Sequence, residues 1–179
     1  MIDDSQKPSP FVVEWVTRLL SQRAEHPAKV LDVAMGRGRH ALVLAEAGAR
    51  VFGVDRRLDA VREARARAAA DGLGLLAWCA DLSAVPLPAA TFDIIVVTRY
   101  LDRLLFEPLR AAVRPGGAIV YETFTVDQPE HGWGPTSPAH LLEHGELRRA
   151  FEGFDELFYE ETVSPEALAR IVARRRERP

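Results

Sequence analysis

Residues 29–38 read KVLDVAMGRG, and this stretch decides the fold class. The run from Lys29 to Ala34 is short and apolar and leads into a glycine loop, which predicts a buried strand followed by a tight turn. Glycines at this point let the backbone pass close to a ligand, and the start of the following helix offers free N–H donors. The order of strand, glycine loop and helix therefore predicts an α/β sheet with a ligand at its edge.

The alternation of strands and helices continues along the chain. Near-continuous apolar strands between helices predict a doubly wound parallel sheet, covered on both faces, with its ligand at the carboxyl ends of the strands. The segment 167–174 fits a helix or a strand, and we interpret it as a strand in a hairpin across Ser164-Pro165. The pattern predicts helices at 10–22, 39–47, 58–70 and 143–151, a helical segment opening near Pro108, a turn at 114–117, and strands at 29–34, 49–54, 75–80, 92–97, 118–122, 154–162 and 167–174.

The composition excludes several classes of protein. Of the 179 residues, 47% are hydrophobic, which fits one globular domain over 1–179 and not a disordered chain. No apolar run approaches the roughly 20 residues of a membrane span, and the polar start does not resemble a signal peptide. The net charge of −3 lacks the basic excess of a nucleic-acid-binding protein. We expect a cytoplasmic protein with a disordered lead at 1–9, an N-terminal helix at 10–22 and a core at 28–174.

Acidic residues end the first strands of the predicted sheet. Asp55 ends the second strand, where a carboxylate can accept both ribose hydroxyls of a nucleoside. Asp81 ends the third strand and can accept the exocyclic amine of adenine. Taken alone, the glycines also fit a tight turn with no ligand, and each aspartate fits a helix cap. Their occurrence at consecutive strand ends favours a nucleotide site.

These motifs resemble those of the class I S-adenosylmethionine-dependent methyltransferases from about Val30 to Ala173. The resemblance rests on the loop 32–38, on Asp55, on the pair Asp81-Leu82, on the strand 92–97 and on the turn 114–117. It implies S-adenosyl-L-methionine as cofactor and a Rossmann-like sheet of seven strands in the order 3-2-1-4-5-7-6, with strand 7 antiparallel. The cofactor-binding residues that it implies are Asp32, Ala34, Met35, Gly36, Gly38, Asp55, Arg56, Asp81, Leu82 and Thr98.

Two further features refine this resemblance. Ala34 stands where the family usually has its first glycine, which departs from the pattern although alanine is small. The small size, the compact glycine loop and the stretch 121–124 (YETF) are similar to small bacterial methyltransferases of the tellurite-resistance type. This closer resemblance does not assign a substrate.

The segment after the fourth strand is expected to face the transferred methyl group. It reads TRYLDR from Thr98 to Arg103 and lacks the Asn/Asp-Pro-Pro-aromatic motif of amide and adenine N-methyltransferases. An arginine here can bind an anionic substrate or simply lie at the surface, and a tyrosine can wall the methyl site or pack in the core. The candidate catalytic residues are Arg99, Tyr100 and Glu122, and the candidate substrate-binding residues are Trp15, Arg103, His131 and Trp133.

Cysteine and histidine do not point to other chemistry. Cys79 is the single cysteine and lies within a predicted buried strand, so we interpret it as core, and a cysteine nucleophile is disfavoured. The remaining histidines have no metal-ligand spacing with cysteine or carboxylate residues, so no metal site is predicted and we interpret them as structural. They are His26, His40, His140 and His144.

The sequence thus predicts in-line methyl transfer to a small-molecule acceptor that enters between the N-terminal helix and the loop 125–137. The alternatives are an RNA methyltransferase that uses the arginine-rich helix 56–67 or the arginines 174–176, and a non-catalytic S-adenosylmethionine-binding protein. A third alternative is an NAD(P)-dependent oxidoreductase, because Gly36-x-Gly38-x-x-Ala41 fits a loose dinucleotide fingerprint. Neither nucleic acid nor a membrane is the expected partner, and the chain is expected to be a monomer or homodimer.

Overall fold

A computed structural model of the chain describes residues 7–22 and 26–177. Most of the lead expected at 1–9 therefore lies outside the described residues, as do the last two residues of the chain. Within the described ranges, no helix is both long and apolar enough to cross a membrane.

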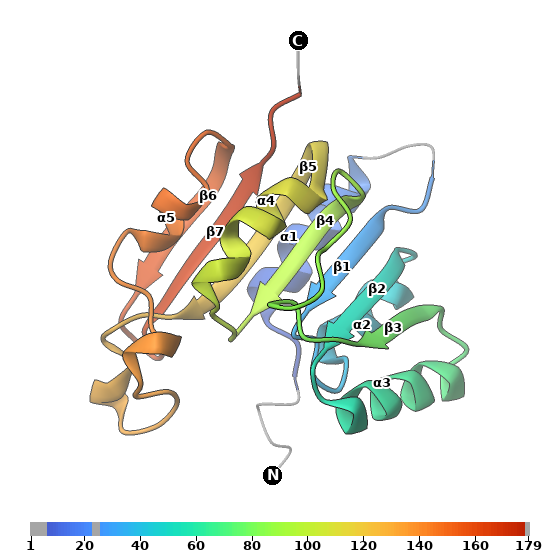
Figure 1. Ribbon diagram of the computed structural model, residues 1–179, viewed down its shortest axis with the longest axis horizontal. Helices are drawn as coiled ribbons and strands as arrows, with labels where there is room; N and C mark the ends of the chain where they lie inside the picture. Colours follow the sequence, from blue (N-terminus) through green and yellow to red (C-terminus); the bar gives the residue numbers. More distant parts are fainter. Residues whose placement is uncertain (1–6, 23–25, 178–179) are drawn as a thin grey trace.

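One seven-stranded sheet runs through the molecule (Figure 1). The strands are β1 (Lys29–Val33), β2 (Arg50–Asp55), β3 (Leu75–Cys79), β4 (Phe92–Thr98), β5 (Val113–Phe124), β6 (Asp155–Thr162) and β7 (Leu168–Arg174). Their spatial order is β3-β2-β1-β4-β5-β7-β6. Strands β1 to β5 pair in parallel, whereas β7 is antiparallel to both β5 and β6. The predicted strand order, the antiparallel seventh strand and the C-terminal hairpin are confirmed.

Helices cover both faces of the sheet, but unequally. The helices are α1 (Pro10–Ser21), α2 (Arg39–Glu46), α3 (Leu58–Ala70), α4 (Phe106–Ala112) and α5 (Glu146–Ala150). Apolar residues of α1 and α2 pack on one face of β1, β2, β4 and β5, while those of α4 and α5 pack on the opposite face. Between β3 and β4 no helix forms, and a proline-containing loop connects them (Figure 1).

Two element boundaries differ from the prediction. Helix α4 begins at Phe106, two residues before Pro108, directly after a short 3₁₀ turn at Arg103–Leu105. The expected turn 114–117 is a bulge inside β5, because Val113 pairs with Phe92 while Ala118 pairs with Ile94. The bulge requires its glycines: Gly116 has a φ of +74°, and a Cβ on Gly117 would lie 2.8 Å from the Asp93 carbonyl oxygen.

The interpretation of Cys79 as core is wrong. Strand β3 lies at the edge of the sheet, so its side chains are at most partly buried, and Cys79 at its end is exposed. Its sulfur lies 3.4 Å from the carbonyl oxygen of Arg56. A run of apolar residues therefore predicted the strand correctly but not its burial, which depends on how many neighbours the strand has.

The apolar stripe of α1 packs against the sheet. Phe11 and Trp15 both pack against Phe158 of β6, with ring centroids 5.6 Å apart in each pair. Leu19, which continues the stripe, is buried in the same cluster. Strand β6 presents an apolar side chain that the helix covers, and Trp15, a candidate substrate-binding residue, takes part in this packing.

Candidate functional site

The glycine loop between β1 and α2 is built from left-handed backbone conformations. Ala34, Gly36 and Gly38 have φ values of +53°, +56° and +82°. Hydrogen bonds hold the turn: the Met35 N–H donates to the Val54 carbonyl oxygen, and the Gly38 N–H donates to that of Met35. A left-handed conformation costs a non-glycine residue energy, so Ala34 is strained at the position where the sequence departs from the family pattern.

Asp55 ties the end of β2 to this loop. One carboxylate oxygen accepts the N–H of Gly36 at 2.8 Å, and the other accepts the N–H of Arg57 at 2.8 Å. A carboxylate oxygen has two acceptor positions, so each oxygen of Asp55 retains one. Asp55 can therefore organise the loop and accept two hydroxyl groups of a ligand at the same time.

Asp32 lies fully buried behind the loop. Its Oδ2 accepts the N–H of Ala41 at 3.1 Å, while its Oδ1 has no hydrogen-bond partner among the described residues. Burial raises the pKa of Asp32 to about 7. A buried, unsatisfied carboxyl oxygen is costly and marks a place where a ligand or a water molecule is expected to complete the hydrogen bonding.

A cavity of about 300 Å³ opens at the carboxyl ends of β1, β2 and β3, and we call it the β2–β3 cavity. Both Asp55 and Asp81 border it. Hydrogen bonds from the Ser83 hydroxyl and N–H lower the pKa of Asp81, so this carboxylate is an acceptor at neutral pH. The lining residues are Val33, Ala34, Val54, Asp55, Arg56, Arg57, Ala80, Asp81, Leu82, Ser83, Tyr100 and Asp102.

A row of polar side chains crosses the sheet at the ends of β4 and β5. Thr98 pairs with Glu122, Glu122 pairs with Arg170, and Arg170 pairs with Glu160, so the row runs through four neighbouring strands. Glu122 is buried, and its carboxylate accepts a hydrogen bond from Arg170 at 2.6 Å. Arg170 also binds Glu160 at 3.1 Å.

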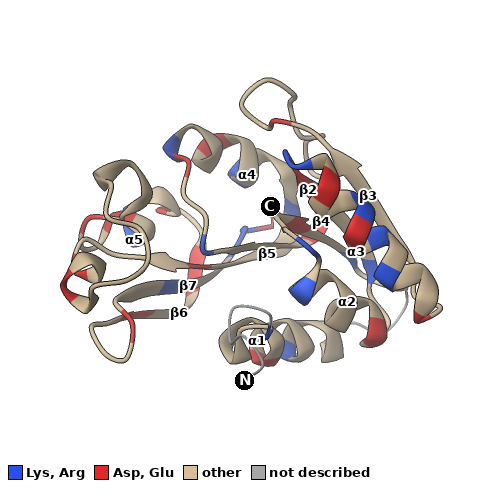
Figure 2. Cartoon of the chain, turned by 90° about the horizontal axis from the view of Figure 1, so that it is seen from below, with Lys and Arg blue, Asp and Glu red and all other residues tan. Residues whose placement is uncertain are grey.

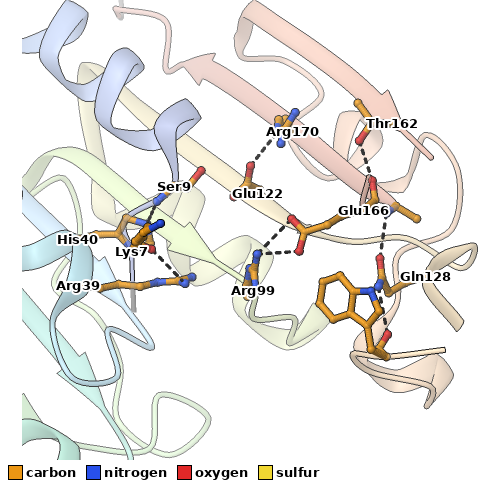
Figure 3. Close-up of polar contacts among 12 residues, drawn as sticks. Lys7, Ser9, Arg39, His40, Arg99, Glu122, Gln128, Thr162, Glu166 and Arg170 are labelled. Atoms are coloured by element: carbon orange, nitrogen blue, oxygen red, sulfur yellow. Dashed lines mark hydrogen bonds and ion pairs between the residues drawn. The ribbon is translucent and has the colours of Figure 1, made fainter. Parts of the chain in front are cut away.

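Arg99 begins the segment after β4 and turns toward the β6–β7 connection. Its guanidinium binds both carboxylate oxygens of Glu166, at 2.7 and 3.1 Å (Figure 3). Its backbone φ is +50°, and its N–H donates to the Glu122 carbonyl oxygen. Strained residues cluster at functional sites, which makes Arg99 a candidate for more than a surface ion pair.

His40 links the N-terminal segment to the end of β4. Its Nε2 must accept the 2.9 Å hydrogen bond from the Ser9 N–H, so Nδ1 carries the proton and donates to the Thr98 hydroxyl at 3.2 Å. Burial lowers the pKa of His40 to about 3, which keeps the ring neutral. His40 is structural, as expected, and it holds residues 7–10 beside the polar row.

Below this segment lies a pocket of about 220 Å³, which we call the charged pocket (Figure 3). Backbone and side chains of residues 8–10 form one wall. The charged side chains that line it are Lys7, Arg39, Arg99, Glu122, Glu166 and Arg170.

A wider cavity of about 650 Å³ adjoins both sites. It shares Arg99 with the charged pocket, and it shares Arg56, Tyr100 and Asp102 with the β2–β3 cavity. Two candidate catalytic residues, Arg99 and Tyr100, therefore stand between the cavity that carries Asp55 and the pocket that carries Glu122.

Some residues proposed from the sequence lie elsewhere. The Met35 side chain is buried against Val61 and Ala64, so only its backbone belongs to the loop. Arg103, by contrast, lines the wider cavity, where Glu146 and the Leu141 carbonyl oxygen, the latter at 2.9 Å, bind its guanidinium group.

The two candidate tryptophans lie on different parts of the fold. Trp15 packs under α1, whereas Trp133 packs edge-on against Phe124 with a centroid distance of 6.1 Å. His131 ends a 3₁₀ turn at Gln128–His131 in the same loop as Trp133. The structure therefore does not bring Trp15 together with His131 and Trp133 as walls of one pocket.

Sequence reasoning missed most of the charged pocket. Thr98 and Glu122 were found because they end predicted strands, but their partners come from distant segments. Only the register Glu122↔Arg170 in the antiparallel pair of β5 and β7 reveals the partner of Glu122. The missed residues are Lys7, Arg39, Glu166 and Arg170.

Comparison with known proteins finds similar methyltransferases. Residues 30–117 match the family described as "Methyltransferase domain". The chain is 40% identical over 113 residues to the protein-L-isoaspartate O-methyltransferase of Xanthobacter autotrophicus, covering 62% of this chain and 50% of that protein. It is 29% identical over 153 residues to the ubiquinone biosynthesis O-methyltransferase of Methylocella silvestris, covering 75% of this chain and 60% of that protein.

Among solved structures, TehB from Haemophilus influenzae matches with a TM-score of 0.75 and 19% identity. The match covers 92% of this chain and 62% of the TehB chain. At this identity the likeness concerns the fold. The chain spans about half the length of the curated isoaspartate methyltransferases that it matches, as with the 51% covered of the protein from Methylorubrum populi.

Proposed function

We propose that the chain is a class I S-adenosylmethionine-dependent methyltransferase and that it transfers the methyl group of S-adenosyl-L-methionine to a small-molecule acceptor. One observation carries the proposal: Asp55 and Asp81 border a single cavity at the ends of neighbouring strands, beside the glycine loop. Their carboxylates supply the acceptors that a ribose and an adenine amine require.

The residues present fit this cofactor. The remaining acceptor positions of Asp55 suit the ribose hydroxyls, and Asp81 stays ionised to accept the amine. The unpartnered Oδ1 of Asp32, buried behind the loop, suits a water-linked contact to the cofactor ammonium. A Cβ on Gly36 would meet no atom within 4 Å, so this turn leaves room for a ligand against the backbone.

When bound, S-adenosylmethionine supplies both the electrophilic methyl group and the leaving group, so the chain has to supply position and exclusion of water. Arg99 and Tyr100 lie at the border between the β2–β3 cavity and the region beyond it. We assign them, with Glu122, to orienting the acceptor. Arg170 holds Glu122 in place through a 2.6 Å hydrogen bond.

A small acceptor is favoured over RNA by the distribution of charge. Acidic and basic residues are interspersed along α3, where Asp59 and Glu63 lie among the arginines (Figure 2). An RNA-binding surface requires clustered positive charge facing the phosphates.

The proposal is tested by assaying release of S-adenosylhomocysteine over a panel of small acceptors, with total RNA included. We expect turnover on at least one small acceptor and none on RNA. Turnover on RNA alone, rising at low salt, contradicts the acceptor class. Cofactor binding without turnover on any member of a broad panel supports a binding protein instead.

A further inference from the structure

Tyr100 is a wall shared by two cavities. It lines the β2–β3 cavity, which carries Asp55 and Asp81, and it also lines the wider cavity beside it. Arg56 and Asp102 line both cavities as well, and Tyr100 is the aromatic residue among the three. Its side chain is half-buried, so the position of the ring affects the space on both sides of it.

The backbone that carries Tyr100 is strained. Arg99, the residue before it, has a φ of +50°. A residue other than glycine keeps such a conformation only where neighbouring groups hold it, and residues of this kind cluster at functional sites. The segment 98–102 therefore needs anchors that keep Tyr100 in place.

Strand β5 supplies two anchors for this segment. The Arg99 N–H donates to the Glu122 carbonyl oxygen at 2.8 Å. The Tyr121 hydroxyl donates to the Tyr100 carbonyl oxygen at 2.9 Å. The first anchor joins two backbone groups and does not depend on the side chains, whereas the second requires the hydroxyl of a tyrosine.

The Tyr121 ring is fixed in the core, so its hydroxyl is a rigid support. The residue is 1% exposed. Its ring packs against Phe106 of α4 and against Phe151, which follows α5, with a centroid distance of 6.2 Å in each pair. A phenylalanine ring would serve this packing equally well, so the hydroxyl is the part of Tyr121 that the core does not require.

We propose that Tyr121 is a positioning residue whose hydroxyl holds Tyr100 as the wall between the cofactor and the methyl acceptor. This inference rests on the proposed methyltransferase function. Without the hydroxyl, the strained segment is released from one of its anchors and the Tyr100 ring moves. Its contact with a cofactor in the β2–β3 cavity then weakens.

Calorimetric titration with S-adenosylhomocysteine tests the inference in the wild type, in Tyr121→Phe, in Tyr100→Ala and in the double variant. Tyr121→Phe should lower the affinity about three- to tenfold, because the segment loses one hydrogen bond. Tyr100→Ala should lower it about tenfold, because the aromatic contact is lost. In the Tyr100→Ala background, Tyr121→Phe should have no further effect, since the ring that the hydroxyl positions is gone.

Tyr159→Phe is the matched control. Tyr159 of β6 also donates its hydroxyl within the protein, to the Glu161 carboxylate, but it lines neither cavity. Its substitution should leave the affinity for S-adenosylhomocysteine within about twofold of the wild type.

The pair of backgrounds separates positioning from a general effect on the fold. Equal losses from Tyr121→Phe in both backgrounds would mean that the hydroxyl only stabilises the fold, which overturns the inference. Unchanged affinity in Tyr121→Phe or in Tyr100→Ala overturns it as well. If the wild type itself does not bind S-adenosylhomocysteine, the proposed function fails, and the inference fails with it.

Discussion

Ala34 stands where the family usually has a glycine, and its backbone keeps the left-handed conformation that suits glycine. Its φ of +53° is ordinary for glycine and strained for alanine. We expect Ala34→Gly to raise the free energy of unfolding by about 0.5–1 kcal/mol, because relief of strain exceeds the extra chain entropy of glycine. Urea denaturation measures the change.

Ala47 provides the matched control. It caps α2 with a φ of −72°, which suits alanine, so Ala47→Gly should lower the free energy of unfolding. Equal destabilisation by both substitutions would mean that Ala34 is not strained.

Asp32 and His40 make opposing contributions to the dependence of stability on pH. The folded protein keeps Asp32 protonated up to a pKa of about 7, so this group loses stabilising effect as the pH rises from about 4 to 7. Burial lowers the pKa of His40 to about 3, so this group destabilises the fold as the pH falls below about 6.5. Between about pH 4 and 6.5 the two groups change the free energy of unfolding with pH in opposite directions, so their pH dependences cancel.

Substitution of either residue should reveal the pH dependence that the other residue contributes. In Asp32→Asn, the free energy of unfolding should rise with pH over this window, relative to the wild type, by up to about 1.4 kcal/mol per pH unit. In His40→Gln, it should fall with pH by a similar amount. Urea denaturation at pH 4, 5 and 6 gives the slopes, and parallel profiles for all three proteins would contradict the assignment.

At the scale of elements, Gln128 joins two connections that border the site. This side chain is fully buried; its Nε2 donates to the Trp133 carbonyl oxygen, and its Oε1 accepts the Ala167 N–H at 2.9 Å. It therefore anchors the loop after β5 to the β6–β7 connection, which carries Glu166 (Figure 3).

Gln128→Leu should lower the free energy of unfolding by about 1–3 kcal/mol, because buried backbone groups lose their partners. Gln22→Leu is the control, since Gln22 makes one exposed hydrogen bond, to Arg174, and should change stability by less than about 0.5 kcal/mol. Equal effects of the two substitutions in chemical denaturation would argue against the anchoring role.

The elements also explain what the sequence could predict. Each strand of the parallel region is an apolar run, and each cofactor motif lies at the end of one, so the ends of β1, β2 and β3 could be located in advance. The contact of Glu122 with Arg170 depends on the register between β5 and β7, two strands that no hairpin joins. That register has no signature in the residues themselves, and the exposure of Cys79 at a sheet edge likewise depends on strand order.

At the scale of the whole molecule, the two candidate sites lie at one end of the sheet. The β2–β3 cavity occupies the ends of β1 to β3, and the charged pocket occupies the ends of β4, β5 and β7. The wider cavity shares lining residues with both. Cofactor and acceptor would thus approach each other across the point where strand order reverses between β1 and β4, as is usual for ligands of doubly wound sheets.

The central claim is that this molecule binds S-adenosylmethionine through Asp55, and calorimetric titration with S-adenosylhomocysteine tests it most directly. The wild type should bind, and Asp55→Asn should bind more weakly by about 1–3 kcal/mol, because the ribose hydroxyls and the glycine loop lose acceptors. Asp71→Asn, the same change at the exposed C-cap of α3, should leave the affinity unaltered. Binding of NADH but not of S-adenosylhomocysteine, or equal affinity in wild type and Asp55→Asn, would contradict the account.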